Sequence, residues 1–438
     1  MGVDISRLEN GLTIATHTMQ QIDSVALGIW VKVGSRNETF SQHGIAHLLE
    51  HMAFKGTENR TAFQIATDIE NVGGEINATT SVETTAYFAR VLKNDVPLAI
   101  DILADILTSS KFNEDELERE KQVIFQEIGA AYDTPDDVVF DHFTKTAFRN
   151  QSLGRSILGT QKTIQSFTSA DLHNFMNKQY SADRMIVVAA GAVEHERFLR
   201  EIESRLGTFR SHSTAPFANL ANYIGGDFRE YRDLMDTQVV LGFEGRPYHA
   251  RDFYAAQILS IILGGGMSSR LFQEIREKRG LCYSIYSFHW DFSDTGLFGI
   301  HAATGQEGLK ALLPVILEEL SKASQNIQVS ELRRAQAQYR ASLTMSRENP
   351  SSQADLIARQ ILLYGRPIPI SEMTERLELI TPERLTDLAD RLFINSNPTL
   401  AAVGPIGTLM NFDDLTSTLS SNTTGALGAR NRSEQRFP

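Results

Sequence analysis

Two histidines and a glutamate lie close together in residues 41–56, SQHGIAHLLEHMAFKG, where they could perform chemistry on a metal ion. They are His47, Glu50 and His51, in the pattern H-x-x-E-H. On a helix, positions i, i+3 and i+4 share one face, so both imidazoles and the carboxylate would point the same way. Two histidines one turn apart can bind one metal ion, and zinc is the usual occupant of such sites. Glu50 would then be placed to accept a proton from a water on the metal.

The chemistry requires this segment to be helical, and the spacing of its apolar residues predicts a helix after Gly44. These residues recur on one face: Ile45, Leu48, Leu49 and Met52. His43 lies one turn before His47, but Gly44 is expected to mark the start of the helix, so His43 is not taken as a ligand. The alternative is an amphipathic helix whose polar face binds no metal, and a third ligand would decide between the two.

A second predicted helix, over residues 113–132, carries two glutamates that could complete a metal site. Asn113 suits the N-cap position, and the acidic residues after it suit a helix N-terminus. Glu120 and Glu127 are about two helical turns apart, so they align on one side of the helix. One could bind the metal while the other supports the site from behind. Without the first motif, both would be interpreted as solvated surface glutamates.

The H-x-x-E-H motif, the FKGT that follows it at residues 54–57, and Glu127 together resemble the pitrilysin/insulinase family of zinc metallopeptidases. Within this family the chain is most similar to the β subunits of mitochondrial processing peptidases and their bacterial relatives. The resemblance extends over nearly the whole chain. It implies that His47, His51 and Glu127 bind one Zn²⁺ per chain, that Glu50 is the general base and that Glu120 supports the site from behind.

Residues 75–91, EINATTSVETTAYFARV, predict a pair of strands with a turn near residues 81–83. The resemblance implies that the first strand is an exposed edge beside the zinc. A peptide substrate would pair there, at Asn77, Ala78 and Thr79. From the residues alone, Asn77 would be interpreted as a turn or strand-start residue.

The second half of the chain repeats the first at an offset of roughly two hundred residues, which indicates a duplicated domain. QVVLGF at residues 238–243 corresponds to SVALGI at 24–29. The segment that corresponds to the motif helix, YAAQILSIIL at 254–263, contains neither His nor Glu. The sequence therefore predicts a catalytic zinc-binding domain, a linker, a second domain without the metal motif and a frayed polar tail, at residues 1–208, 209–227, 228–414 and 415–438 respectively.

Arg276 and Tyr283 follow the Gly-rich stretch of the second half, where residues 267–280 predict a helix and 281–290 a strand. They match an Arg/Tyr pair that the family uses to face the zinc. The resemblance implies that they bind substrate and stabilise charge on the carbonyl oxygen during the reaction. From the residues alone, they would be a surface charge and a packed strand residue.

Composition sets further limits. The chain of 438 residues is long enough for two domains, and no apolar run is long enough to span a membrane. The N-terminal residues lack the pattern of a signal or transit sequence, and the single cysteine, Cys282, excludes an internal disulfide. A cytoplasmic protein is therefore expected, unless processing has removed such a signal. The net charge of −12 argues against nucleic acid as a partner. An acidic surface favours basic peptides, unless the charge serves solubility alone.

We therefore expect an α+β protein of two similar domains, each an antiparallel sheet with helices packed on one face, acting as a zinc endopeptidase. Four-domain members of the family enclose a chamber in which the zinc domain faces the last domain. A two-domain chain would need two copies for this, so we expect a homodimer in which Arg276 and Tyr283 act in trans. Two alternatives stay open: a structural or assembly subunit without proteolysis, and a peptide-binding carrier or chaperone with an incidental metal.

Overall fold

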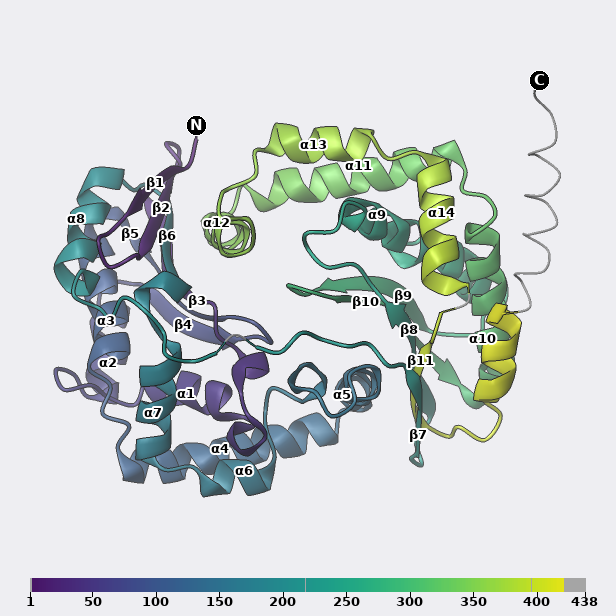
Figure 1. Cartoon of the computed structure of the whole chain (residues 1–438), viewed down its shortest axis with the longest axis horizontal. Coiled ribbons are helices and arrows are strands. Elements are labelled where there is room, and N and C mark those ends of the chain that lie inside the picture. Colours follow the sequence, from purple (N-terminus) through teal and green to yellow (C-terminus); the bar gives the residue numbers. More distant parts are fainter. Residues whose placement is uncertain (1, 217, 395, 421–438) are drawn as a thin grey trace. The chain divides into compact units, whose positions relative to one another are not determined.

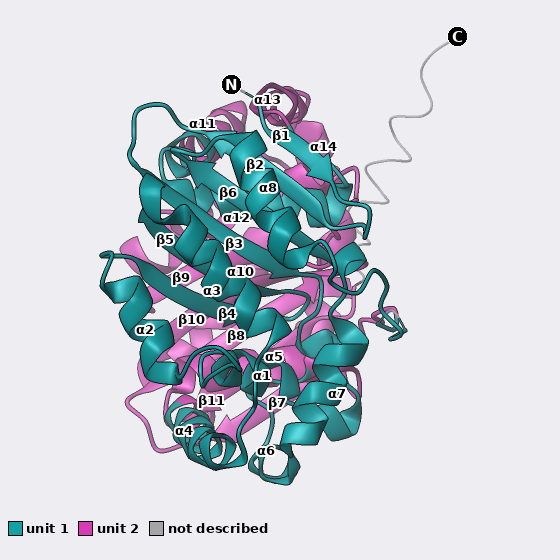
Figure 2. Ribbon diagram, turned by 90° about the vertical axis from the view of Figure 1, so that its left-hand side faces the viewer, with its two compact units in different colours: residues 1–130, 155–219, 342–368 teal, residues 131–154, 220–341, 369–438 magenta. Residues whose placement is uncertain are grey.

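The computed structural model of the chain describes residues 2–216, 218–394 and 396–420 (Figure 1). Contacts divide the chain into two compact units, coloured separately in Figure 2. Unit 1 comprises Met1–Ala130, Arg155–Asn219 and Ser342–Ile368, and unit 2 comprises Ala131–Gly154, Leu220–Ala341 and Pro369–Pro438. Each unit is a sheet packed with helices, which confirms the predicted α+β class.

Unit 1 contains a six-stranded sheet in the order β1-β2-β6-β3-β5-β4. Neighbouring strands are antiparallel, except that β2 and β6 are parallel. The strand β4 lies at one edge, as expected for the first strand of the predicted pair. The strands are β1 (Asp4–Arg7), β2 (Thr13–Thr18), β3 (Ser24–Val31), β4 (Glu75–Thr80), β5 (Thr85–Leu92) and β6 (Met185–Gly191).

One face of this sheet carries the main core of unit 1. Because successive strand residues point to opposite faces, Leu27, Ile29 and Val31 of β3 all enter this core. Helices with apolar stripes at helical spacing cover them, among them α3 and α8, seen beside the sheet in Figure 1. The helices of this layer are α1 (Ile45–Ala53), α2 (Ala62–Glu70), α3 (Val96–Thr108), α4 (Glu114–Tyr132), α6 (Gln161–Ser166), α7 (Ser169–Gln179) and α8 (His195–Leu206).

The opposite face of the same sheet is covered by α12 (Pro350–Tyr364), a helix from the second half of the sequence. Trp30, which points away from Ile29, packs there with Ala86 against Ala354 and Ile357. The structure thus adds a helix to the second face of the predicted domain. The near-continuous apolar run of β3, SVALGIWV, is typical of a strand buried on both faces.

Unit 2 contains a five-stranded sheet in the order β7-β11-β8-β10-β9. Its pairing is also antiparallel apart from one parallel pair, β11 with β7. The order matches that of β2-β6-β3-β5-β4 in unit 1, which agrees with a duplicated domain. The strands are β7 (Gly226–Tyr231), β8 (Asp236–Glu244), β9 (Ser284–Asp291), β10 (Gly296–Gly305) and β11 (Thr399–Gly404).

The second sheet is likewise covered on both faces. Phe243 of β8 packs against Phe393 of a C-terminal helix, whereas Phe143 of a helix from the first half approaches the neighbouring Gly242. A Cβ on Gly242 would lie 2.4 Å from the Phe143 ring, so this close approach requires glycine. The helices of unit 2 are α5 (Pro135–Ala147), α9 (Phe253–Gly264), α10 (Gln306–Ala323), α13 (Ile370–Glu378) and α14 (Pro382–Phe393), while α11 (Val329–Ser346) runs from unit 2 into unit 1.

Each half of the sequence therefore contributes one helix, α5 or α12, to the sheet of the other half. The two compact units therefore differ from the domains predicted from the sequence, because each unit includes a helix from the other half of the chain. The predicted domain boundaries stay a prediction.

Three local expectations changed. The helix predicted over 267–280 is a short π-helical segment, Phe272–Glu277, and the strand after it begins at Ser284. The tail is not frayed at its start, because residues 412–420 are helical and bury Leu415 and Leu419; residues 421–438 lie outside the described part.

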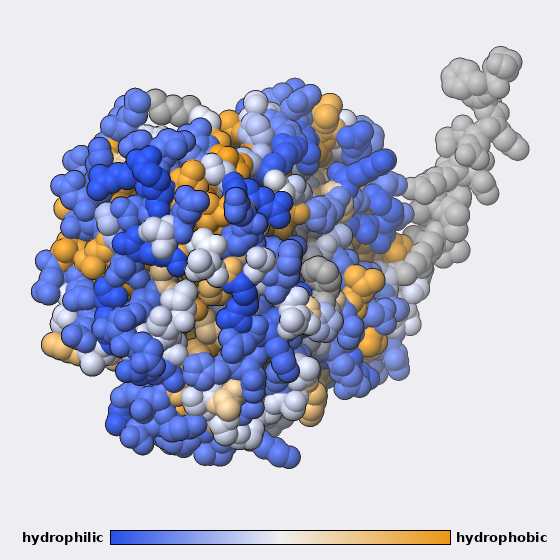
Figure 3. Space-filling model, turned by 60° about the vertical axis from the view of Figure 1, so that its left-hand side comes forward, coloured by the Kyte–Doolittle hydropathy of each residue, from blue (hydrophilic) through white to orange (hydrophobic). Residues whose placement is uncertain are grey.

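Within the described residues, no helix combines the length and apolarity needed to span a bilayer. On the face drawn in Figure 3, hydrophilic side chains predominate and apolar ones form small scattered groups.

Candidate metal centre

The motif helix α1 begins at Gly44, as predicted. Gly44 has φ +95°, which an L side chain rarely adopts, and a Cβ there would lie 2.7 Å from the Cα of Gly159. His43, the neighbouring histidine that we excluded, hydrogen bonds instead to the carbonyl oxygen of Ser156 at 2.7 Å. The sharp turn at Gly44 therefore separates His43 from the histidines of the helix.

A buried carboxylate caps the start of α1. Glu38, which is 4 % exposed, accepts hydrogen bonds from the backbone N–H groups of Gly44 and Ala46, both at 2.9 Å. Burial raises the pKa of Glu38 to about 8, although these two N–H groups and Arg155 favour the charged form. Glu38 was not recognisable from the sequence, because no fixed spacing marks a cap contributed by the loop before a helix.

Removing this cap is expected to destabilise the folded protein. Glu38→Ala leaves two buried N–H groups without their acceptor, so the free energy of unfolding should fall by about 1–3 kcal/mol. Because the pKa of Glu38 is raised in the folded state, the wild-type protein is stabilised at low pH, where Glu38 is protonated. This contribution is lost as the pH rises through about 8. Glu38→Gln cannot ionise, so its stability should fall less than that of the wild type over this pH range. Urea unfolding across pH measures both effects, and equal pH slopes would contradict the second.

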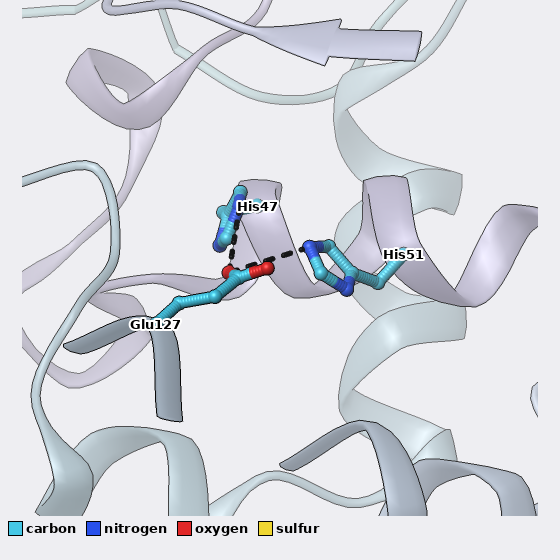
Figure 4. A group of neighbouring side chains, drawn as sticks. All are labelled: His47, His51 and Glu127. Carbon is cyan, nitrogen blue, oxygen red and sulfur yellow. Dashed lines mark ion pairs between the residues drawn. The ribbon is translucent and has the colours of Figure 1, made fainter. Parts of the chain in front are cut away.

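Three ligand atoms converge beside α1, where His47 and His51 meet Glu127 of α4 (Figure 4). Glu127 Oε2 lies 3.7 Å from His47 Nε2 and 3.6 Å from His51 Nε2. These distances exceed those of hydrogen bonds. They are close to the roughly 3.3 Å that separates two ligands in a tetrahedral site with metal–ligand bonds of about 2.0–2.1 Å. No other group of this kind occurs among the residues that the structure describes.

The protonation of His47 fits metal binding, whereas that of His51 depends on the cation. Burial, together with the nearby His51, lowers the pKa of His47 to about 4, so His47 is neutral at pH 7 and has a free lone pair. Burial alone would lower the pKa of His51 too, but Glu120 and Glu127 raise it in the metal-free chain. A divalent cation among these groups would hold His51 neutral. The donor set of two imidazoles and one carboxylate is one that zinc prefers.

Glu120 contacts His51 at the ring nitrogen that does not face the ligand cluster. It is 6 % exposed, and its Oε2 lies 3.1 Å from His51 Nδ1. Lys55 Nζ lies 2.7 Å from its other oxygen. Burial alone would raise the pKa of Glu120, but the hydrogen bonds with His51 and Lys55 lower it, so it remains a carboxylate. Lys55 was not identified from the sequence as part of the site, although its position four residues after His51 was a usable sign.

Glu120 orients the ligand His51 but is not itself one of the converging ligands. Its loss should therefore reduce zinc affinity or activity less than the loss of a ligand does. Glu120→Gln is expected to lower zinc affinity or activity by about ten- to a hundredfold. Competition with a chelator of known affinity measures the first quantity, and peptide turnover at saturating zinc measures the second. Unchanged affinity and turnover would show that the contact with His51 is not needed.

Glu50 shares the histidine face of α1. Burial raises its pKa, while interactions with Thr80 of β4 and with His51 oppose the rise. A raised pKa makes a carboxylate a better proton acceptor near neutral pH. Thr80, the last residue of β4, was not identified from the sequence.

The edge strand β4 places the three expected substrate-binding residues side by side. Asn77 and Thr79 are exposed, whereas Ala78 is buried at 8 % exposure. The Asn77 side-chain oxygen accepts a hydrogen bond from the backbone N–H of Ala78 at 2.8 Å. Among the strands that the structure describes, β4 pairs with β5 alone, so its other edge has no strand partner there.

Arg276 and Tyr283 lie together in unit 2. The Arg276 guanidinium is 5.9 Å from the centre of the Tyr283 ring and 4.7 Å from that of Phe272. Tyr283 is 83 % exposed, so it is not the packed strand residue that its sequence context alone indicated.

Comparisons with known proteins give matches over most of the chain. The family model described as "Insulinase (Peptidase family M16)" matches residues 13–161, and "Peptidase M16 inactive domain" matches 166–339. An uncharacterized zinc protease of Rickettsia felis is 40 % identical over 92 % of this chain and 97 % of its own length. The probable mitochondrial-processing peptidase subunit beta of Arabidopsis thaliana is 34 % identical over 93 % and 80 % respectively. The crystal structure of a protease from Helicobacter pylori has the same fold, with a TM-score of 0.85, 23 % identity, and coverage of 92 % of this chain and 99 % of that chain.

Proposed function

The chain belongs to peptidase family M16, the insulinase family, and we propose that it is a zinc-dependent endopeptidase with one Zn²⁺ per chain. The observation that carries this proposal is the convergence of His47, His51 and Glu127 next to the carboxylate of Glu50. Zn²⁺ held by these residues would supply Lewis-acid chemistry, polarising a peptide carbonyl and making water a stronger nucleophile at neutral pH.

The remaining steps belong to side chains of this protein. Glu50 accepts the proton of the attacking water and passes it to the leaving amine, so one carboxylate acts as base and then as acid. Glu120 keeps the His51 ring oriented through its Nδ1, and Lys55 keeps Glu120 charged and in place.

The proposed substrate is an extended peptide that adds to the edge of β4 at Asn77, Ala78 and Thr79. Main-chain hydrogen bonds along such an edge bind peptides of many sequences, and adjacent pockets provide selectivity. The net charge of −12 favours basic, presequence-like peptides over acidic ones.

The proposed assembly is a cytoplasmic homodimer that encloses the substrate in a chamber. Arg276 and Tyr283 of one copy would bind the carbonyl group of the substrate at the zinc site of the other. The exposure of Tyr283 beside Arg276 supports this arrangement, because the pair is accessible on unit 2.

Trans action predicts complementation between two inactive variants. Glu50→Gln and Tyr283→Phe proteins, mixed under conditions that allow subunit exchange, would form dimers in which one site has both wild-type residues. Peptide cleavage should therefore return on mixing. If exchange is demonstrated and no cleavage returns, or if the active protein sediments as a monomer, the trans arrangement is wrong.

The experiment that tests the function is incubation of the purified protein with a mixed peptide library, with cut sites identified by mass spectrometry and metal content measured on the same sample. We expect bound zinc and internal cleavage. Inactive protein without zinc would favour a structural or assembly subunit. Tight peptide binding without turnover would favour a carrier or chaperone.

A further inference from the structure

A cavity of about 1120 Å³ lies along the edge strand β4, and all of its lining residues belong to unit 1. Its walls come from α2, from the sheet and from the first turns of α12. Since Glu75, Ile76, Asn77 and Thr79 of β4 line the cavity, a peptide paired with this strand would project its side chains into it.

The alternation of β4 divides the cavity into two sides. Ile76 points to the face of the sheet that carries α2, while Glu75, Asn77 and Thr79 point to the face that carries α12. We name these parts the α2 side and the α12 side. Alternate side chains of a peptide on β4 would enter the two sides in turn.

The strand register sets the shape of the α12 side. Thr79 lies opposite Ala86, which lies opposite Trp30, and Asn77 lies opposite Phe88 in the next row. Trp30, Ala86 and Phe88 all line the cavity on this side. The first turns of α12 close this space with polar residues, namely Ser351, Ser352 and Asp355.

The charges along the cavity are not balanced. Both of its cationic residues are already paired, Lys55 with Glu120 and Arg90 with Glu75. Two of its carboxylates, Glu70 on α2 and Asp355 on α12, have no ion-pair partner in the described part of the chain. The Asp355 carboxylate accepts one hydrogen bond, from Trp30 Nε1 at 3.1 Å. The available charge on the α12 side is therefore negative.

We propose that Asp355 makes the α12 side of the cavity a subsite for a basic side chain, lysine or arginine, of the substrate peptide. The aliphatic stem of that side chain packs over Ala86 and Phe88, and its cationic end pairs with the Asp355 carboxylate. The inference rests on the proposed pairing of peptides with β4. It gives the second half of the sequence a role in substrate selection within unit 1, through α12.

The test compares peptides of one sequence in which each position in turn carries lysine, glutamine or glutamate. For the wild type, kcat/KM should favour lysine over glutamine at one position by about three- to tenfold, as expected for a partly exposed ion pair. In Asp355→Asn, which keeps an oxygen for Trp30, this ratio should fall to about one. Asp355→Lys should favour glutamate at the same position.

The matched control is Glu196→Gln, which removes an exposed carboxylate of α8 outside the cavity and should leave the lysine preference unchanged. The proposal is overturned if the wild type prefers lysine at no position, if Asp355→Asn keeps the preference, or if Glu196→Gln loses it equally.

A binding measurement separates this proposal from the proposed catalysis. Zinc-loaded Glu50→Gln protein, with and without Asp355→Asn, is titrated with the same peptides carrying a fluorophore. The lysine preference should appear in Kd and should disappear with Asp355→Asn. If the wild type cleaves nothing but this pattern is found, the proposed activity fails and the subsite stands. If none of the peptides binds, the subsite is wrong.

Discussion

Glu50→Gln should abolish peptide cleavage and leave zinc bound. The amide has the shape of the carboxylate but cannot accept the proton of the attacking water, so kcat should fall by about 10²- to 10⁴-fold. Glu50 is not one of the three converging ligands, so zinc content should stay at the wild-type level. Turnover and metal content measured on the same preparation test both statements.

The control for this substitution is Glu196→Gln, the same chemical change at an exposed position on α8, which should retain wild-type turnover. Loss of zinc from Glu50→Gln would show that Glu50 is a ligand. Retention of most of the turnover would show that another group accepts the proton.

The second large effect is expected from the ligands. Each of three substitutions leaves a site with only two protein ligands: His47→Ala, His51→Ala and Glu127→Gln. Two ligands bind zinc weakly, so bound metal and activity should both be lost. His43→Gln is the matched control, because it changes a nearby histidine and keeps a donor for the Ser156 carbonyl oxygen. Its zinc content should equal that of the wild type.

The choice between the two glutamates of α4 is tested in the same series. Full zinc content in Glu127→Gln together with loss of zinc in Glu120→Gln would contradict the assignment. The geometry favours Glu127 as the ligand, because its Oε2 lies near the Nε2 atoms of both histidines, whereas Glu120 contacts the opposite ring nitrogen of His51.

The features that the sequence predicted well are local. Apolar residues at helical spacing after Gly44 predicted α1 and the shared face of His47 and His51. The run at residues 75–91 predicted β4, its turn and β5, because it is rich in β-branched and aromatic residues. Within α4, spacing aligned Glu120 and Glu127 without choosing between them. The resemblance implied Glu127 as the ligand, and in the fold Glu127 lies near both histidines.

The features that the sequence did not reveal depend on contacts between distant segments. The exchange of α5 and α12 between the two sheets leaves little trace in periodicity, since an amphipathic helix does not specify which sheet it covers. Glu38 and Asp355 are further examples. Each is an ordinary polar residue in the sequence. Glu38 gains its role from its contact with the start of α1, and Asp355 gains its proposed role from its place in the cavity along β4.

The most direct test of the central claim is zinc titration of metal-free protein, with peptide turnover measured at each addition. If His47, His51 and Glu127 form the catalytic metal site, turnover should rise from zero in proportion to added zinc and stop rising at one Zn²⁺ per chain. The same titration of Glu127→Gln should show no such break. Full turnover before zinc is added, or a rise that is unchanged in Glu127→Gln, would contradict the account.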